Sequence, residues 1–200
     1  LRELEGAIED FTRAIALDDT LDDAYLWRGM ARGRAGELDS AVADLTVYLR
    51  SNPKDSHGFT KRGVRHLWQG DLRSAEMDFR RAIALDPGNA EAHDDLGVIL
   101  ANRREYDRAH EQFTTVVELD PGYQKGWHNL AMVHYLTGRH ERALHAVNES
   151  LRLAPNDGDG LRLKGQILLA TGREQEALAL FERADFAPGH KHWTERFPAQ

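Results

Sequence analysis

The sequence predicts an all-α protein made of repeated helix–turn–helix segments, and two observations carry this prediction. Alanine and leucine occur 25 times each, whereas valine and isoleucine occur only 8 and 5 times. Because Ala and Leu are strong helix formers and β-branched residues favour strands, this balance argues against a large sheet. Prolines also recur at a fixed gap of 34 residues, at Pro53, Pro87, Pro121 and Pro155. A constant period of this length indicates a repeat architecture.

Other positions keep the same period. One column is small, a second is always alanine, and a third, four residues after the alanine, is large and apolar. The small column is Gly29, Gly63, Gly97, Ala131 and Gly165; the alanine column is Ala7, Ala41, Ala75, Ala109, Ala143 and Ala177; the large column is Phe11, Leu45, Phe79, Phe113, Val147 and Phe181. Apolar residues within each repeat follow helical spacing on two faces, so each repeat contains two helices.

The period divides the chain into elements in order. Residues 1–21 form the second helix of a truncated leading repeat. The repeats then occupy 22–55, 56–89, 90–123, 124–157 and 158–187, and residues 188–200 form a C-terminal cap or tail. This division predicts about eleven helices plus the short cap. Because the chain opens in mid-repeat, we expect it to be a piece of a longer protein.

Two finer patterns lead to structural predictions. A glycine suited to the left-handed end of a first helix recurs between the paired helices, but Arg104 occupies this column in one repeat. Five residue pairs, ten positions apart, match alanine with alanine and larger residues with glycine. These pairs are Ala14/Ala24, Tyr48/Gly58, Ala82/Ala92, Val116/Gly126 and Ser150/Gly160. We expect the members of each pair to touch between successive repeats, because close packing conserves volume.

A 34-residue helix–turn–helix repeat with these columns resembles the tetratricopeptide repeat family. The resemblance rests on the triplet Trp127, Leu130 and Ala131, on the columns of Ala143 and Phe113, and on Pro121. It extends over roughly Leu1 to Phe186. The resemblance implies a right-handed α-solenoid whose first helices line a concave groove, with a protein or peptide partner bound there.

The face of the first helices that the resemblance turns toward the groove gives the candidate binding residues. They are Met30, Lys61, Val64, Trp68, Asp94, Val98, Asn102, Lys125, His128, Asn129, Met132, Tyr135 and Arg162. Solvent-facing apolar residues in this set suggest contacts with a partner's side chains. The alternative is that neighbouring repeats cover the apolar column of this face. Charge alternates along the set, which favours an extended peptide of mixed charge.

Some family members bind acidic C-terminal peptides through a two-carboxylate clamp of Lys, Asn and Arg on first helices. The leading Lys–Asn pair of that clamp is absent here, so no clamp residue is assigned. The favoured function is a non-catalytic protein–protein interaction scaffold that binds a peptide or helix in the groove. Two alternatives stay open: a regulatory or substrate-recruiting arm of a larger enzyme, and a self-assembling scaffold joined through its open ends or its C-terminal tail.

Several function classes are excluded or disfavoured by composition. The absence of cysteine excludes disulfides, thiolate metal sites and a cysteine nucleophile. No phosphate-binding loop, nucleophile elbow or zinc-protease signature occurs, so we predict no enzyme activity, no catalytic residue and no cofactor. The net charge of −7 argues against a general nucleic-acid binder. No apolar stretch is long enough for a membrane span.

The C-terminal segment carries two further expectations. His190 and His192 form a His-x-His pair, which we interpret as solvated tail residues and not as a metal site. Phe186, Trp193 and Phe197 are expected to form the apolar face of a short capping helix. The sequence assigns no compartment, although a soluble protein of the cytoplasm is favoured.

Overall fold

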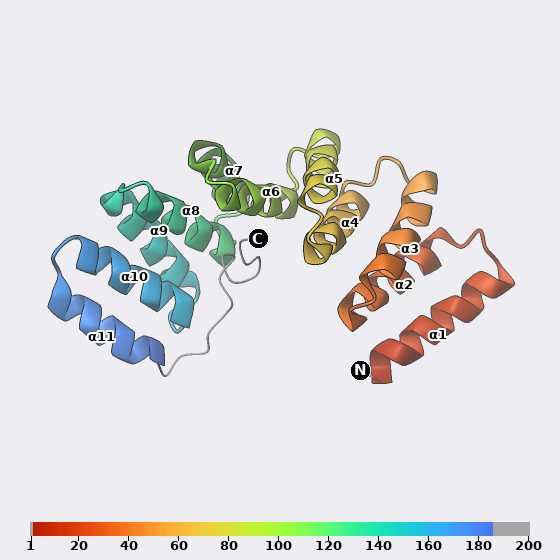
Figure 1. Cartoon of the computed structure of the whole chain (residues 1–200), viewed down its shortest axis with the longest axis horizontal. Helices are drawn as coiled ribbons and strands as arrows, with labels where there is room; N and C mark the ends of the chain where they lie inside the picture. The colour runs from red at the N-terminus through yellow and green to blue at the C-terminus, as the bar shows by residue number, and fades with distance from the viewer. Residues whose placement is uncertain (1, 186–200) are drawn as a thin grey trace. The chain divides into compact units, whose positions relative to one another are not determined.

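The structure is a computed structural model that describes residues 2–185, and these residues form α-helices and no strand (Figure 1). The helices are α1 (Arg2–Leu17), α2 (Asp22–Ala35), α3 (Leu38–Ser51), α4 (Ser56–Gln69), α5 (Leu72–Leu85), α6 (Ala90–Asn102), α7 (Tyr106–Leu119), α8 (Gln124–Leu136), α9 (His140–Leu153), α10 (Gly158–Ala170) and α11 (Glu174–Asp185). The prediction of an all-α repeat fold with eleven helices is confirmed for this part of the chain. The predicted cap and the His190/His192 pair lie outside the described residues.

The chain divides into two compact units, with the boundary between Asp95 and Leu96 inside α6. In unit 1, each helix from α1 to α4 packs against the next, and α2 also contacts α4. In unit 2, each helix from α7 to α10 packs against the next, and α8 also contacts α10. The even-numbered helices are the first helices of the repeats. Within each unit, therefore, first helices of successive repeats are neighbours: α2 with α4, and α8 with α10.

The periodic alanines and large apolar residues form the core. Ala41, Ala75, Ala109, Ala143 and Ala177 expose none of their surface. The small column explains how the paired helices approach so closely. A Cβ atom on Gly63 would lie 2.7 Å from Cε1 of Phe79, and one on Gly165 would lie 2.6 Å from Cε1 of Phe181. The aromatic ring of the second helix occupies the space that a side chain on the first helix would need.

The predicted contacts between successive repeats are confirmed for two of the three glycine pairs. A Cβ atom on Gly58 would lie 3.0 Å from Cε1 of Tyr48, and one on Gly126 would lie 2.5 Å from Cγ1 of Val116. The third pair, Ser150 and Gly160, stays a prediction, because the atoms nearest to a Cβ atom on Gly160 belong to Asp157 and Leu151, each at 3.0 Å. The hydroxyl of Ser150 accepts a hydrogen bond from Gln124. The two alanine pairs stay predictions.

Arg104 adopts the left-handed backbone conformation that its column requires, with a φ of 61°. The glycines of this column have φ values between 72° and 86°. Because a Cβ atom makes this region unfavourable, Arg104→Gly should raise the free energy of unfolding by about 1 kcal/mol. The measurement is urea denaturation followed by circular dichroism.

The reverse substitution in the next repeat tests whether backbone strain is the cause. Nothing lies within 4 Å of a Cβ atom built on Gly138, which has a φ of 72°. Gly138→Arg should therefore lower the free energy of unfolding by about 1 kcal/mol through the backbone alone. If both variants shift stability in the same direction, backbone strain at this column is not the cause.

Candidate binding face on the first helices

Two neighbouring first helices of unit 1 present matching stripes of apolar and basic side chains. On each helix three side chains follow one another at intervals of three and four residues, so they lie on one side of the helix. The stripe on α2 is Trp27, Met30 and Arg34, and the stripe on α4 is Lys61, Val64 and Trp68. The two stripes occupy the same columns of the 34-residue period. We call these six residues the unit 1 face.

The unit 1 face exposes large apolar side chains to solvent. Trp27 and Trp68 expose 54% and 51% of their surfaces, and Arg34 is also exposed. Met30 and Val64 lie between them and are half-buried. Exposed tryptophans beside basic groups are typical of binding surfaces, because aromatic and arginine side chains carry much of the energy of interfaces.

Lys61 of the unit 1 face is held by a carboxylate. Its Nζ atom donates to both carboxylate oxygens of Glu91, at 2.7 and 2.8 Å. Beside it, the guanidinium of Arg65 lies over the Trp68 ring, with Cζ 5.1 Å from the ring centroid. Arg65 itself is buried and lies against Trp68 of the unit 1 face.

Two ion pairs between a half-buried arginine and a buried aspartate fix the helices that carry this face. Arg62 of α4 donates to both carboxylate oxygens of Asp78 on α5, at 2.7 and 2.8 Å, and to Thr46 on α3 at 3.2 Å. One repeat earlier, Arg28 of α2 makes the equivalent bonds to Asp44 at 2.7 and 2.9 Å. Each arginine thus ties its helix to a second helix, and sets the orientation of its stripe.

The sequence interpretation missed these pairs, although a signal was present. Arg28 and Asp44 recur exactly one period later as Arg62 and Asp78, and Thr12 recurs as Thr46. In the repeat of residues 124–157 both columns are apolar, with Leu130 and Ala146, whereas the repeats before and after it pair one apolar residue with Gln112 or Lys164. An apolar pair can therefore take the place of the ion pair within this chain.

The candidate residues of unit 2 are arranged differently. Met132 and Tyr135 of α8 are half-buried, Lys125 is exposed, and Arg162 forms an ion pair with Asp159 on its own helix. Tyr135 lies near His140, with ring centroids 6.1 Å apart. Unit 2 therefore has no counterpart of the paired, half-exposed tryptophans within its described residues. Asn102, at the end of α6, is half-buried, and its Nδ2 atom has no hydrogen-bond partner among the described residues.

The expectation of solvent exposure was wrong for four candidate residues. Asp94, Val98, His128 and Asn129 expose 0%, 6%, 7% and 4% of their surfaces. The reason is clearest for α8, because three helices, α7, α9 and α10, pack against it. Little of its surface is left for His128 and Asn129 to expose. A stripe that faces solvent on one first helix is thus partly covered on another.

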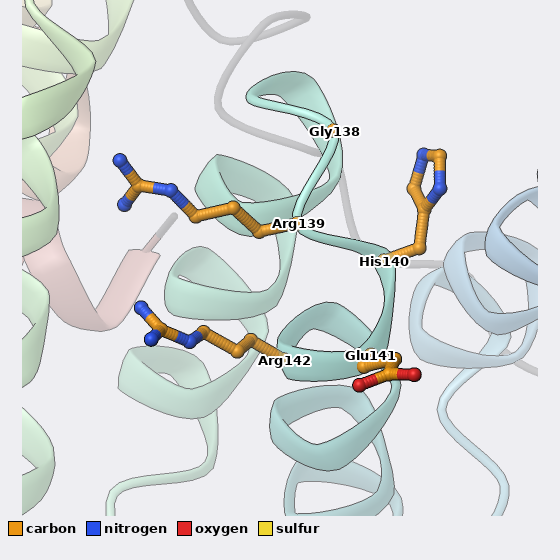
Figure 2. A pocket seen from close by; sticks show the side chains of 5 residues that line it. All are labelled: Gly138, Arg139, His140, Glu141 and Arg142. Carbon is orange, nitrogen blue, oxygen red and sulfur yellow. The ribbon is translucent and has the colours of Figure 1, made fainter.

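A second cluster of basic groups lies at the start of α9. A pocket of about 420 Å³ is lined by Gly138, Arg139, His140, Glu141 and Arg142. The side chains of Arg139 and Arg142 extend to the same side (Figure 2). The rings of His110 and His134 lie nearby, with centroids 4.9 Å apart. Burial, together with His110 and the two arginines, lowers the pKa of His134 to about 4. Burial and the same arginines also lower the pKa of His110.

Residues 2–185 contain neither a metal-ligand cluster nor a membrane-spanning helix. No group of three or more potential metal ligands comes together in this part of the chain. No helix there has both the length and the apolar character needed to cross a membrane.

Comparisons with known proteins agree with the repeat architecture. No protein with a curated description matches this sequence. The crystal structure of MamA is similar with a TM-score of 0.71 at 22% identity, over 79% of this chain and 92% of that chain. The crystal structure of the APC/C hetero-tetramer Cut9–Hcn1 is similar with a TM-score of 0.81 at 18% identity. That match includes 98% of this chain but 39% of the other chain.

These structural likenesses establish the fold, and a family profile establishes the membership. The profile described as Tetratricopeptide repeat matches residues 1–56, 60–124, 95–158 and 128–191. The matches together span most of the sequence. The chain therefore belongs to the tetratricopeptide repeat family.

Proposed function

We propose that this protein is a non-catalytic protein–protein interaction scaffold that binds an extended segment of a partner protein on its first helices, with the unit 1 face as the main contact. The observation that carries the proposal is the pair of half-exposed tryptophans, Trp27 and Trp68, on neighbouring helices. Membership of a family of helical repeats and the likeness to solved repeat proteins support the general role.

The composition of the face favours a segment with apolar and acidic residues. Trp27, Met30, Val64 and Trp68 offer apolar surface to a partner's side chains, and Arg34 adds an exposed positive charge. Aromatic and basic groups combined in this way select a partner by shape and by charge. The half-buried Met132 and Tyr135 of unit 2 are a second contact in this proposal.

The test is quantitative capture of partners from a lysate of the source cells, using the whole chain. Trp27→Ala/Trp68→Ala should reduce recovery of the specific partner at least about tenfold, because truncating interface tryptophans often costs more than 2 kcal/mol. The matched control is Met77→Ala on the second helix α5, where Met77 exposes 63% of its surface. Circular dichroism must show unchanged helicity in both variants.

Two outcomes would contradict the proposal. Recovery of the same partners by the double tryptophan variant would move the binding surface away from the unit 1 face. Loss of the partner from the Met77→Ala variant alone would place binding on the second helices. A variant with Met132→Glu and Tyr135→Ala measures the contribution of unit 2 in the same experiment.

A further inference from the structure

Arg65 is a buried arginine in a column that is otherwise apolar. The equivalent positions in the other repeats hold Ala31, Ile99, Val133 and Ile167, and all four are buried. Arg65 itself exposes 3% of its surface. Burial of a guanidinium without a counter-charge is far more costly than burial of an aliphatic side chain. The repeat fold alone does not require a charge at this position.

The polar contacts of Arg65 are weak among the described residues. Its Nη1 atom lies 3.4 Å from the carbonyl oxygen of Lys61. Its Nη2 atom lies 3.5 Å from the carbonyl oxygen of Met30 and 3.3 Å from the Met30 sulfur. Both carbonyls lie inside helices, where a backbone N–H already donates to them, and a thioether is a weak acceptor. The Nε atom has no hydrogen-bond partner in the described part of the chain.

The carboxylate that attracts Arg65, that of Glu91, is already bound by another basic residue. Glu91 attracts the guanidinium, but its two oxygens are bound by Lys61 at 2.7 and 2.8 Å. Burial and the positive charge of Arg34 both lower the pKa of Arg65. In residues 2–185 no carboxylate forms an ion pair with Arg65. The guanidinium therefore has a positive charge and spare donors.

Gly33 makes room for the guanidinium. A Cβ atom on Gly33 would lie 2.3 Å from the Nε atom of Arg65, which is too close for any side chain to be accommodated without displacement. In unit 2 the equivalent pair is Ala101 and Val133, both buried. Gly33 is the one glycine in its column of the repeat, and Arg65 is the one arginine in its own column. The missing side chain at Gly33 therefore leaves the space that the Arg65 guanidinium occupies.

From these contacts we propose that Arg65 binds a carboxylate of the partner segment, as the polar anchor of the unit 1 face. This inference rests on the proposed function and names the chemistry of its ligand. Two carboxylate oxygens accept from the guanidinium in place of the long contacts to Met30. The flexible Met30 side chain moves aside to admit them, while Trp68 stays stacked on the guanidinium. The carboxylate is either an Asp or Glu side chain or the C-terminus of the partner.

The experiment begins with peptides selected for binding to the whole chain from a random library with free C-termini. Each selected peptide is then synthesised unchanged, with Asp and Glu replaced by Asn and Gln, and with an amidated C-terminus. Fluorescence anisotropy gives the dissociation constants. Because an ion-paired hydrogen bond is lost, one of the two neutral forms should bind at least about tenfold more weakly. The form that loses affinity identifies the source of the carboxylate.

A variant that copies another repeat removes the anchor without disturbing the fold. Gly33→Ala/Arg65→Val reproduces the Ala101/Val133 pair of unit 2. It should bind the unchanged peptide at least about tenfold more weakly and should no longer distinguish it from the neutral form. Arg65→Lys keeps the charge but loses the two-pronged geometry, so an intermediate loss is expected. Circular dichroism and melting curves check that each variant is folded.

The outcomes separate this inference from the proposed function. Peptides that need Trp27 and Trp68 but bind equally well in neutral form, or equally well to the Gly33→Ala/Arg65→Val variant, would overturn the inference and keep the proposed function. Failure to select any peptide, or selection of peptides insensitive to both tryptophans, would overturn the two together. Carboxylate dependence that disappears with Arg65 supports both.

Discussion

Asp78→Ala should lower the free energy of unfolding by about 3 kcal/mol, because it leaves the half-buried Arg62 without its counter-charge. The Arg62 side chain exposes 20% of its surface and that of Asp78 exposes 7%. The two form a pair of parallel hydrogen bonds between α4 and α5. Urea denaturation measures the loss, and hydrogen exchange should place it in unit 1, since repeat proteins lose structure unit by unit.

The chain itself supplies the compensating variant. Leu130 and Ala146 occupy the same two columns in unit 2, and both are buried. Arg62→Leu/Asp78→Ala should therefore regain most of the stability and fall within about 1 kcal/mol of the unchanged protein, because well-packed apolar residues can replace a buried ion pair. If the double variant is as unstable as Asp78→Ala, the pair's own bonds, and not the stranded charge, determine the cost.

Acid should destabilise unit 2 through His134. Its pKa is lowered to about 4 in the folded protein, by burial first and then by His110, Arg139 and Arg142. An unfolded histidine has a pKa of about 6.5, so the unfolded chain binds the proton more readily. The stabilisation is complete above about pH 6.5 and is lost as the pH falls toward 4. The loss should reach about 3 kcal/mol, since each pKa unit is worth about 1.4 kcal/mol.

His134→Leu is the matched control for this pH dependence. The same column holds Leu100 and Leu168, which expose 1% of their surfaces, so leucine is accommodated at this position in other repeats. Carboxylates titrate in both proteins, so the difference between their stability curves isolates the histidine. Equal slopes of stability against pH between 6.5 and 4 would show that His134 does not carry the effect.

The repeat order, the helix count and the close packing were predictable because they depend on columns that recur every 34 residues. The alanine column, the Gly63/Phe79 type of pair and the Tyr48/Gly58 contact all express steric rules that act over short distances. The Arg104 conformation followed from the glycine column in the same way. Each of these features repeats, so the sequence carries several copies of the same evidence.

The candidate site was only partly predictable, because exposure depends on what packs against each helix. Trp68 is exposed and Met30 and Val64 are half-buried, whereas Val98 and His128, from the same set, are buried. Arg65 was visible in the sequence as the one charged residue of an apolar column. Its role as an unpaired buried charge appears only when the distances to Met30 and Lys61 are known.

The sequence by itself determined the family and the pairing of helices, since steric columns repeated along the chain leave few alternatives. The tertiary structure decided which first-helix residues face solvent and which charges are paired. The physical reason is that burial and ion pairing are set by contacts between residues distant in sequence, such as Arg65 with Gly33 and Arg62 with Asp78.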